Sequence, residues 1–138
     1  VVEDDMQNYY DILLVSRVII LASPVFFYGL SAQAKAFIDR CQALWNRRRI
    51  LKTAEERKRH DGGTGYLMMT GAASGLNLFT GGELTVKYFF DSLDKSYGGG
   101  IFFKAEHMGD IAGNNADLNR AYRFGADAVA VEREGGGR

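Results

Sequence analysis

The sequence predicts an α/β fold in which helices cover both faces of a parallel sheet. Short apolar runs typical of buried strands alternate with longer segments whose apolar residues recur every three or four positions, as on one face of a helix. The resulting order of helix, strand, helix, strand, helix, strand, helix is the alternation that produces parallel sheets. With 138 residues the chain is long enough for its own core, so we expect a single domain over residues 1–138.

The first half of the chain is expected to hold one strand between two helices. Residues 4–15 have apolar side chains at helical spacing, with Asp4 or Asp5 available as a cap. The run VIILA, residues 18–22, is continuously aliphatic, as strands buried on both faces are. Residues 31–46 again show helical spacing, and Ser31 is suited to accept the first amide hydrogen bonds.

Residues 47–64 are expected to form an exposed basic loop. Positions 47–60 carry seven basic and two acidic residues without a clear apolar face, and a glycine pair follows. A solvated loop is the favoured interpretation. The alternative is that its arginines grip a phosphate group or extend over a neighbouring subunit, because planar guanidinium groups suit phosphate oxygens.

The second half is expected to contain two strands and two helices. Residues 65–70 form a strand, and a glycine-punctuated loop leads to a helix opened by a capping box of Thr80 and Glu83. This helix is expected to present Val86, Phe89, Phe90, Leu93 and Tyr97 on one side. Gly98 to Gly100 are expected to end it, before a strand over 101–105. A last helix, capped by Asn114 or Asn115, is expected to turn Leu118, Ala121, Tyr122, Gly125 and Val129 inward, and residues 134–138 are expected to be a flexible tail.

Composition excludes several classes of protein. Seventeen basic and seventeen acidic residues argue against a nucleic-acid partner for the whole molecule. The longest aliphatic run is far below the ~18 residues of a membrane span, and the start shows no signal-peptide pattern, so we expect no membrane association and a cytoplasmic location. The lone Cys41 is expected to be a buried core thiol, and His60 and His107 lack carboxylates at ligand spacing, so no metal site is assigned.

The unusual residues follow the first two predicted strands. SPVFFYG, residues 23–29, places three aromatic residues in a turn, and TGAASG, residues 70–75, is rich in glycine and small residues. Open parallel sheets bind ligands beyond the carboxyl ends of their strands, where these loops lie. Two interpretations remain open: the rings pack into the core, or a planar ligand, a partner subunit or both cover them.

Resemblance to a known family favours the ligand. Residues 19–45, IILASPVFFYGLSAQAKAFIDRCQALW, resemble the signature segment of the NADPH-dependent FMN reductase and iron-sulfur flavoprotein group of the flavodoxin-like superfamily. The opening VVEDDMQNYYDIL and the segment GYLMMTGAASG also resemble it, and Gly109-Asp110 is compatible. The implied fold is a flavodoxin-like, doubly wound parallel sheet.

The resemblance also implies a site and an activity. One side of FMN would contact Ser23, Pro24, Val25, Phe26, Phe27, Tyr28 and Gly29, and the other Thr70, Gly71, Ala72, Ala73 and Gly75. No catalytic side chain is implied, because the cofactor performs the hydride chemistry. The implied activity is an FMN-dependent NAD(P)H oxidoreductase of the flavin or quinone reductase type. NADPH or NADH would be the reductant, a small molecule such as a flavin or quinone the acceptor, and the assembly a homodimer or tetramer.

Two alternatives stay open. One is an electron carrier of the iron-sulfur flavoprotein kind, although Cys41 alone cannot hold a cluster. The other is a fragment that does not bind flavin.

The family's phosphate-binding loop follows its first strand, and no such segment precedes Val18. We therefore expect that the first strand–helix unit is lacking, that Val18 to Ala22 lie at a sheet edge, and that this chain alone binds FMN weakly unless another chain or further residues complete the site.

Overall fold

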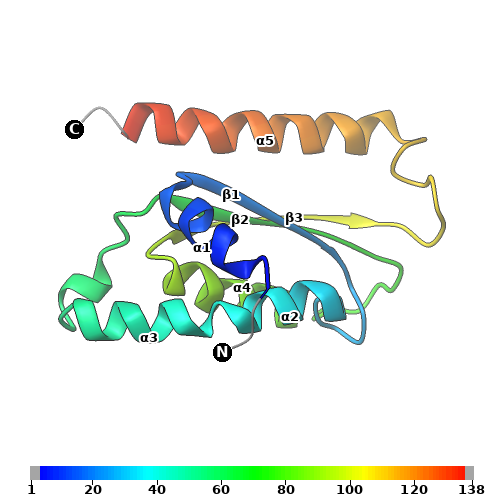
Figure 1. Cartoon of the computed structure of the whole chain (residues 1–138). Coiled ribbons are helices and arrows are strands. Elements are labelled where there is room, and N and C mark those ends of the chain that lie inside the picture. The colour runs from blue at the N-terminus through cyan, green and yellow to red at the C-terminus, as the bar shows by residue number, and fades with distance from the viewer. Residues whose placement is uncertain (1–3, 136–138) are drawn as a thin grey trace.

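The computed structural model describes residues 4–135, and side chains up to residue 131. It contains a three-stranded sheet with helices on both faces (Figure 1). In chain order the elements are α1 (Met6–Val15), β1 (Val18–Pro24), α2 (Ala32–Arg40), α3 (Gln42–Leu51), the 3-10 turn η1 (Glu56–Lys58), β2 (Thr64–Gly71), α4 (Thr80–Ser92), β3 (Ser96–Lys104) and α5 (Asn115–Gly135).

The sheet is parallel throughout, with the strand order β1-β2-β3. Val18 pairs with Thr64 at one end of the β1–β2 ladder and Pro24 pairs with Thr70 at the other. All three strands therefore end at the same edge of the sheet. The predicted α/β class with a parallel sheet is confirmed, and β1 lies at a sheet edge among the described residues, as expected.

The main core lies between the sheet and the layer formed by α2, α3 and α4. Leu67 and Met69 of β2 are fully buried, and Val86 and Phe90 of α4 meet them. Cys41, at the break between α2 and α3, is 1% exposed, which confirms the predicted core thiol. Burial in this apolar layer raises the pKa of the Cys41 thiol to about 11, so the thiol stays protonated at neutral pH.

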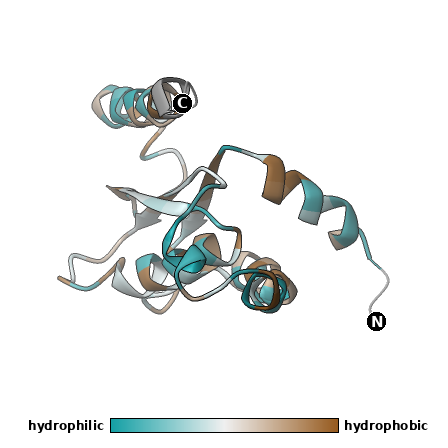
Figure 2. Cartoon of the chain, turned by 90° about the vertical axis from the view of Figure 1, so that its left-hand side faces the viewer, coloured by the Kyte–Doolittle hydropathy of each residue, from teal (hydrophilic) through white to brown (hydrophobic). Residues whose placement is uncertain are grey.

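Among the described residues, helix α5 alone covers the opposite face, as Figure 2 shows in a view along this helix. Phe124 meets Tyr66 of β2 edge-on at 5.5 Å between ring centroids, and Ala128 is buried. Asn114 caps the helix through its side-chain oxygen, which accepts from the amides of Ala116 and Asp117. The prediction that Leu118, Tyr122 and Val129 point inward was wrong, since they are 43%, 77% and 43% exposed.

Helix α1 packs beside α2. The Tyr10 hydroxyl donates to the Arg40 carbonyl at 2.9 Å, Asp4 pairs with the Arg40 guanidinium, and Tyr9 meets Phe37 edge-on. No helix in the described part of the chain combines the length and apolar character needed to cross a bilayer.

The predicted helix over 31–46 divides at Cys41 and continues to Leu51, so the expected start of the exposed basic loop at residue 47 was wrong. The reason is Arg48, which is buried and binds the carboxylates of Asp91 and Asp94 at 3.0 Å each. In the sequence, the charge of Arg48 indicated a solvent-exposed segment. The carboxylates that allow it to be buried lie more than forty residues away in the chain, so the local pattern did not reveal them.

The predicted boundary between α4 and β3 was also wrong. The chain turns at Asp94, which has a positive φ of 63°, and Tyr97 to Gly100 belong to the strand. A side chain at Gly98 would lie 2.4 Å from the Tyr66 ring, so glycine makes room for a neighbouring aromatic group. The predicted capping box is not formed either, because Thr80 is already helical and Glu83 accepts a hydrogen bond from Tyr97 instead.

Helix α5 runs to Gly135, so Glu134 and Gly135 are helical rather than part of the predicted flexible tail. Residues 136–138 of that prediction lie outside the described residues.

Gly65 allows α4 to approach β2 closely. An alanine Cβ there would lie 2.2 Å from the ring of Phe90, which is fully buried and has no room to move. We expect Gly65→Ala to lower the free energy of unfolding by about 1–3 kcal/mol through overpacking. Urea denaturation checks this, with Gly125→Ala as the control, because a Cβ there meets nothing within 4 Å and the helix should gain about 0.5–1 kcal/mol. Equal stability of the Gly65→Ala variant and the parent chain would contradict this account of the α4–β2 contact.

Candidate functional site

The aromatic segment after β1 is a tight hairpin. The Phe26 amide donates to the Gly29 carbonyl at 3.0 Å, and the Gly29 amide donates back to the Phe26 carbonyl at 2.9 Å. Between them Phe27 and Tyr28 have φ values of 48° and 62°. Two central residues with positive φ define a type I′ turn, which normally takes Asn-Gly or a similar pair.

The turn therefore holds two bulky residues in the left-handed region without burying them. Left-handed backbone costs about 1–2 kcal/mol for an ordinary residue, and such strain is concentrated at functional sites. Phe26, Phe27 and Tyr28 are 59%, 105% and 52% exposed. The interpretation in which these rings pack into the core is thus wrong, and the fold presents them at its surface.

Hydrogen bonds fix both ends of the hairpin. Ser23 is buried, and its hydroxyl donates to the Pro24 carbonyl and accepts from the Ser31 amide at 3.0 Å. Ser31 in turn caps α2 by accepting from the Ala34 amide. These bonds couple the end of β1 to the start of α2, so the hairpin projects from a fixed base.

The loop after β2 lies against the hairpin. The Val25 amide donates to the Thr70 carbonyl at 2.8 Å, and a Cβ at Gly71 would touch the Val25 side chain at 3.3 Å. Farther along, a Cβ at Gly75 would lie 2.9 Å from the Tyr28 hydroxyl oxygen. The structure therefore brings the two predicted loops together through Val25, Thr70, Gly71, Tyr28 and Gly75.

The first turn of helix α4 packs against the backbone at the tip of the hairpin. A Cβ at Gly81, in its first turn, would lie 2.3 Å from the Tyr28 carbonyl oxygen. Only glycine permits this approach of the helix to the left-handed residue. Sequence reasoning missed Gly81, although the pair Gly81-Gly82 at a predicted helix start is a signal of close backbone contact.

The end of β3 also reaches the site, through its last residue, Lys104. Its ammonium nitrogen lies 3.4 Å from the Ser74 hydroxyl oxygen and remains largely exposed. Lys104 lies near the end of the strand expected over residues 101–105, and its charge within the otherwise apolar run IFFKA was the signal that could have found it. It places a positive charge beside the glycine-rich loop.

The two predicted loops also offer unused hydrogen-bond donors. Within residues 4–135, the backbone amides of Phe27 and Tyr28 and those of residues 72–75 donate to no acceptor. Ala72 and Ala73 are exposed. Near the hairpin base, Ala22, Ser23, Pro24, Met68 and Thr70 line an open depression of about 260 Å³ at the ends of β1 and β2. The arrangement combines flat apolar rings, free amides and a shallow hollow.

The basic segment lies at the other end of the sheet. The Thr64 amide, at the start of β2, donates to the Arg17 carbonyl just before β1. Since the strands are seven to nine residues long, roughly 25 Å separates the two edges. The Arg57 guanidinium binds the Lys52 carbonyl at 2.7 Å, so the segment is packed on α3 and does not reach the hairpin of its own chain.

His60 has a carboxylate partner that the sequence did not reveal. Its Nε2 atom lies 2.9 Å from an Asp91 oxygen. The fold brings this pair together beside Arg48, away from the hairpin.

Comparisons with known proteins agree with the geometry. Residues 1–78, which include both loops, match the model of the NADPH-dependent FMN reductase family. An iron-sulfur flavoprotein of Archaeoglobus fulgidus is 46% identical over 43 residues, which is 31% of this chain and 22% of that protein. The Trp repressor binding protein from Bacillus subtilis, a solved structure, matches with a TM-score of 0.65 at 21% identity, covering 88% of this chain and 71% of that one, and this likeness shows the fold alone. The chain therefore has a flavodoxin-like fold and belongs to the NADPH-dependent FMN reductase family.

Proposed function

We propose that the chain binds FMN between the Ser23 to Gly29 hairpin and the Thr70 to Gly75 loop. We further propose that it acts as an FMN-dependent NAD(P)H oxidoreductase or as part of one. The observation that carries this proposal is the strained, exposed Phe27-Tyr28 turn inside the segment that matches the family. A turn that costs stability and leaves its rings uncovered is explained when a flat ligand covers them.

The residues present fit the ring system of a flavin. Its polar edge carries nitrogen and oxygen acceptors, and the free amides of Phe27, Tyr28 and residues 72–75 are matching donors. Its faces are flat and apolar, as are the exposed rings of the hairpin. When bound, FMN would supply the hydride-accepting chemistry, so no nucleophile or general base is required of the protein.

The chain's own groups would hold the flavin-binding loops in place and supply charge near the bound FMN. The Ser23 hydroxyl holds the base of the hairpin, and Gly81 lets α4 support the Tyr28 backbone. Lys104 adds a positive charge beside Ser74, which favours negative charge arising nearby. NADPH or NADH, and a small acceptor such as a flavin or quinone, would reach FMN from the side that the two loops do not cover. Oligomers, dimeric or tetrameric, would place a second copy near this edge.

A titration with FMN tests the binding step. Flavin fluorescence should fall saturably on adding the chain, and the affinity should be weaker than submicromolar. Oxidation of NADPH, followed by its absorbance with FMN and a quinone present, tests the reaction. If FMN shows no saturable binding at high micromolar concentrations of the chain, the proposal is contradicted.

The iron-sulfur flavoprotein match supports a second candidate, in which the flavin relays electrons between proteins. Saturable FMN binding together with no turnover of NADPH or NADH would favour this electron carrier over the reductase.

A further inference from the structure

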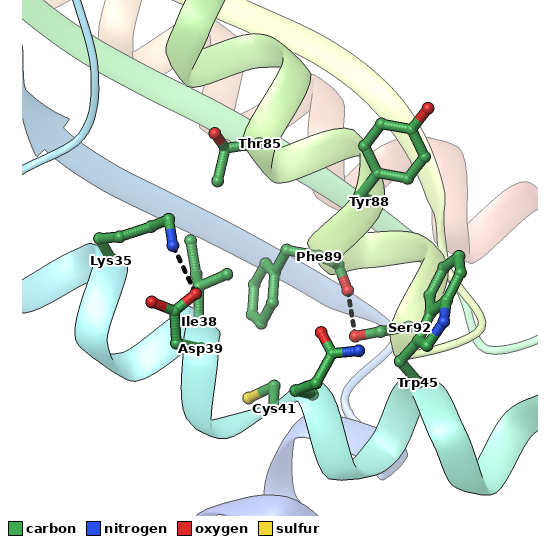
Figure 3. Close-up of a pocket in the computed structure, with 10 residues that line it drawn as sticks. Lys35, Ile38, Asp39, Cys41, Trp45, Thr85, Tyr88, Phe89 and Ser92 are labelled. Atoms are coloured by element: carbon green, nitrogen blue, oxygen red, sulfur yellow. Dashed lines mark hydrogen bonds and ion pairs between the residues drawn. The ribbon is translucent and has the colours of Figure 1, made fainter.

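A second hollow lies in the helical layer, apart from the candidate flavin site. It is a cleft of about 320 Å³ between α2–α3 on one side and α4 on the other, and Figure 3 shows its walls. Cys41, at the break between α2 and α3, is one of the residues that line it. None of its lining residues belongs to the hairpin or to the loop after β2.

The walls of this α3–α4 cleft are mainly aromatic. The ring of Trp45 meets that of Tyr88 edge-on at 6.4 Å between centroids, and Phe89 forms the inner wall with Ile38. The volume is at the lower end of the range for small-molecule sites. Size and shape thus favour a small planar molecule.

Two hydroxyl groups give the cleft acceptors. Ser92 donates its hydroxyl proton to the Phe89 carbonyl at 2.6 Å, and Thr85 donates to the Gly81 carbonyl at 2.9 Å. Each hydroxyl has only one proton, so each presents only lone pairs to a ligand. Thr85 and Ser92 lie seven residues apart on α4, about 10 Å along the helix axis, so one amide group of a ligand reaches only one of them. Gln42 also lines the cleft, and its exposed side-chain amide has no hydrogen-bond partner among the side chains described up to residue 131 or the backbone of residues 4–135, so it can both donate and accept. A ligand that binds both Ser92 and Gln42 must therefore carry an N–H donor and an acceptor.

The cleft has no net charge to offer. Lys35 and Asp39 both line it and pair with each other at 2.5 Å, and the Cys41 thiol is protonated. A charged ligand would lose its hydration on entering the cleft and would find no opposite charge there to compensate for it. The lining therefore favours a neutral molecule.

We propose that the α3–α4 cleft is a binding site for a small, neutral aromatic amide. The ring lies between Trp45 and Phe89, an amide N–H group donates to Ser92, and the carbonyl accepts from Gln42. The proposal is independent of flavin binding.

Benzamide is the probe, and Trp45 is the reporter because it is the chain's single tryptophan. Benzamide should change Trp45 emission saturably with one-to-one stoichiometry by calorimetry. Ser92→Ala removes the acceptor, and we expect it to weaken binding about 5- to 10-fold. Benzoate should bind at least fivefold more weakly than benzamide.

Leu84→Ala is the matched control, because Leu84 is exposed on α4 without lining the cleft, and its affinity should equal that of the parent chain. Tyr88→Ala, at a residue 61% exposed, tests the aromatic wall without threatening the fold, and a weakening of at least threefold is expected. Thermal unfolding confirms that each variant is folded. Failure of benzamide to saturate, equal binding by Ser92→Ala and the parent, or equal loss in Leu84→Ala would each overturn the proposal.

Discussion

Replacing Phe27-Tyr28 by Asn-Gly is expected to stabilise the fold while weakening FMN binding by at least tenfold. Asn-Gly is the preferred pair for a type I′ turn, and the present residues hold φ values of 48° and 62°. Removing this strain should raise the free energy of unfolding by about 1–2 kcal/mol. Binding should fall because the two exposed rings that would contact the flavin are removed.

Urea denaturation and FMN titration of the same preparations measure the two effects. Leu76→Ala is the control, since this fully exposed loop residue lies outside the turn and should leave stability unchanged. Unchanged FMN affinity in the Asn-Gly variant would remove the reason for a strained turn. A loss of stability would show that Phe27 and Tyr28 support the fold.

Arg48→Met is expected to lower the free energy of unfolding by about 3–5 kcal/mol. The guanidinium is buried, binds Asp91 and Asp94, and donates to the carbonyls of Arg57 and Arg59 at 2.8 and 3.3 Å. Methionine fills similar space but leaves two carboxylates and two carbonyls without this partner. Since a domain is stable by only about 5–15 kcal/mol, the variant should be marginal at 37 °C.

Arg49→Met is the matched control, because Arg49 is exposed on the same helix and should change stability by less than about 0.5 kcal/mol. Urea midpoints compare the two variants. Equal midpoints would mean that the Arg48 network adds nothing to the fold.

The strands and the order of the elements were predictable because continuous aliphatic runs such as residues 18–22 have few alternatives to a strand. The expected burial of this run on both faces was wrong, because β1 lies at the sheet edge and Ile20 is 40% exposed. The boundaries that failed depend on contacts distant in sequence. Arg48 is helical and buried because Asp91 and Asp94 lie opposite, and Gly98 belongs to β3 because the Tyr66 ring fills the space beside it. No local pattern contains either fact.

The same distinction holds at the candidate site. The two loops could be located because parallel strands end at one edge, and their aromatic and glycine residues are visible in the sequence. The left-handed turn was not predictable, because Phe and Tyr are unusual in it. The support from Gly81 and the position of Lys104 beside Ser74 follow from the folding of α4 and β3 back to this edge.

The central claim is that FMN lies against the Phe27-Tyr28 turn. The most direct measurement is the set of backbone amide chemical shifts in ¹⁵N-labelled chain during titration with FMN. The account predicts saturable shifts at Phe27, Tyr28 and residues 72–75, with little change at Trp45 and Tyr88. Shifts confined to the α3–α4 cleft, or none at the hairpin when FMN is bound, would contradict it.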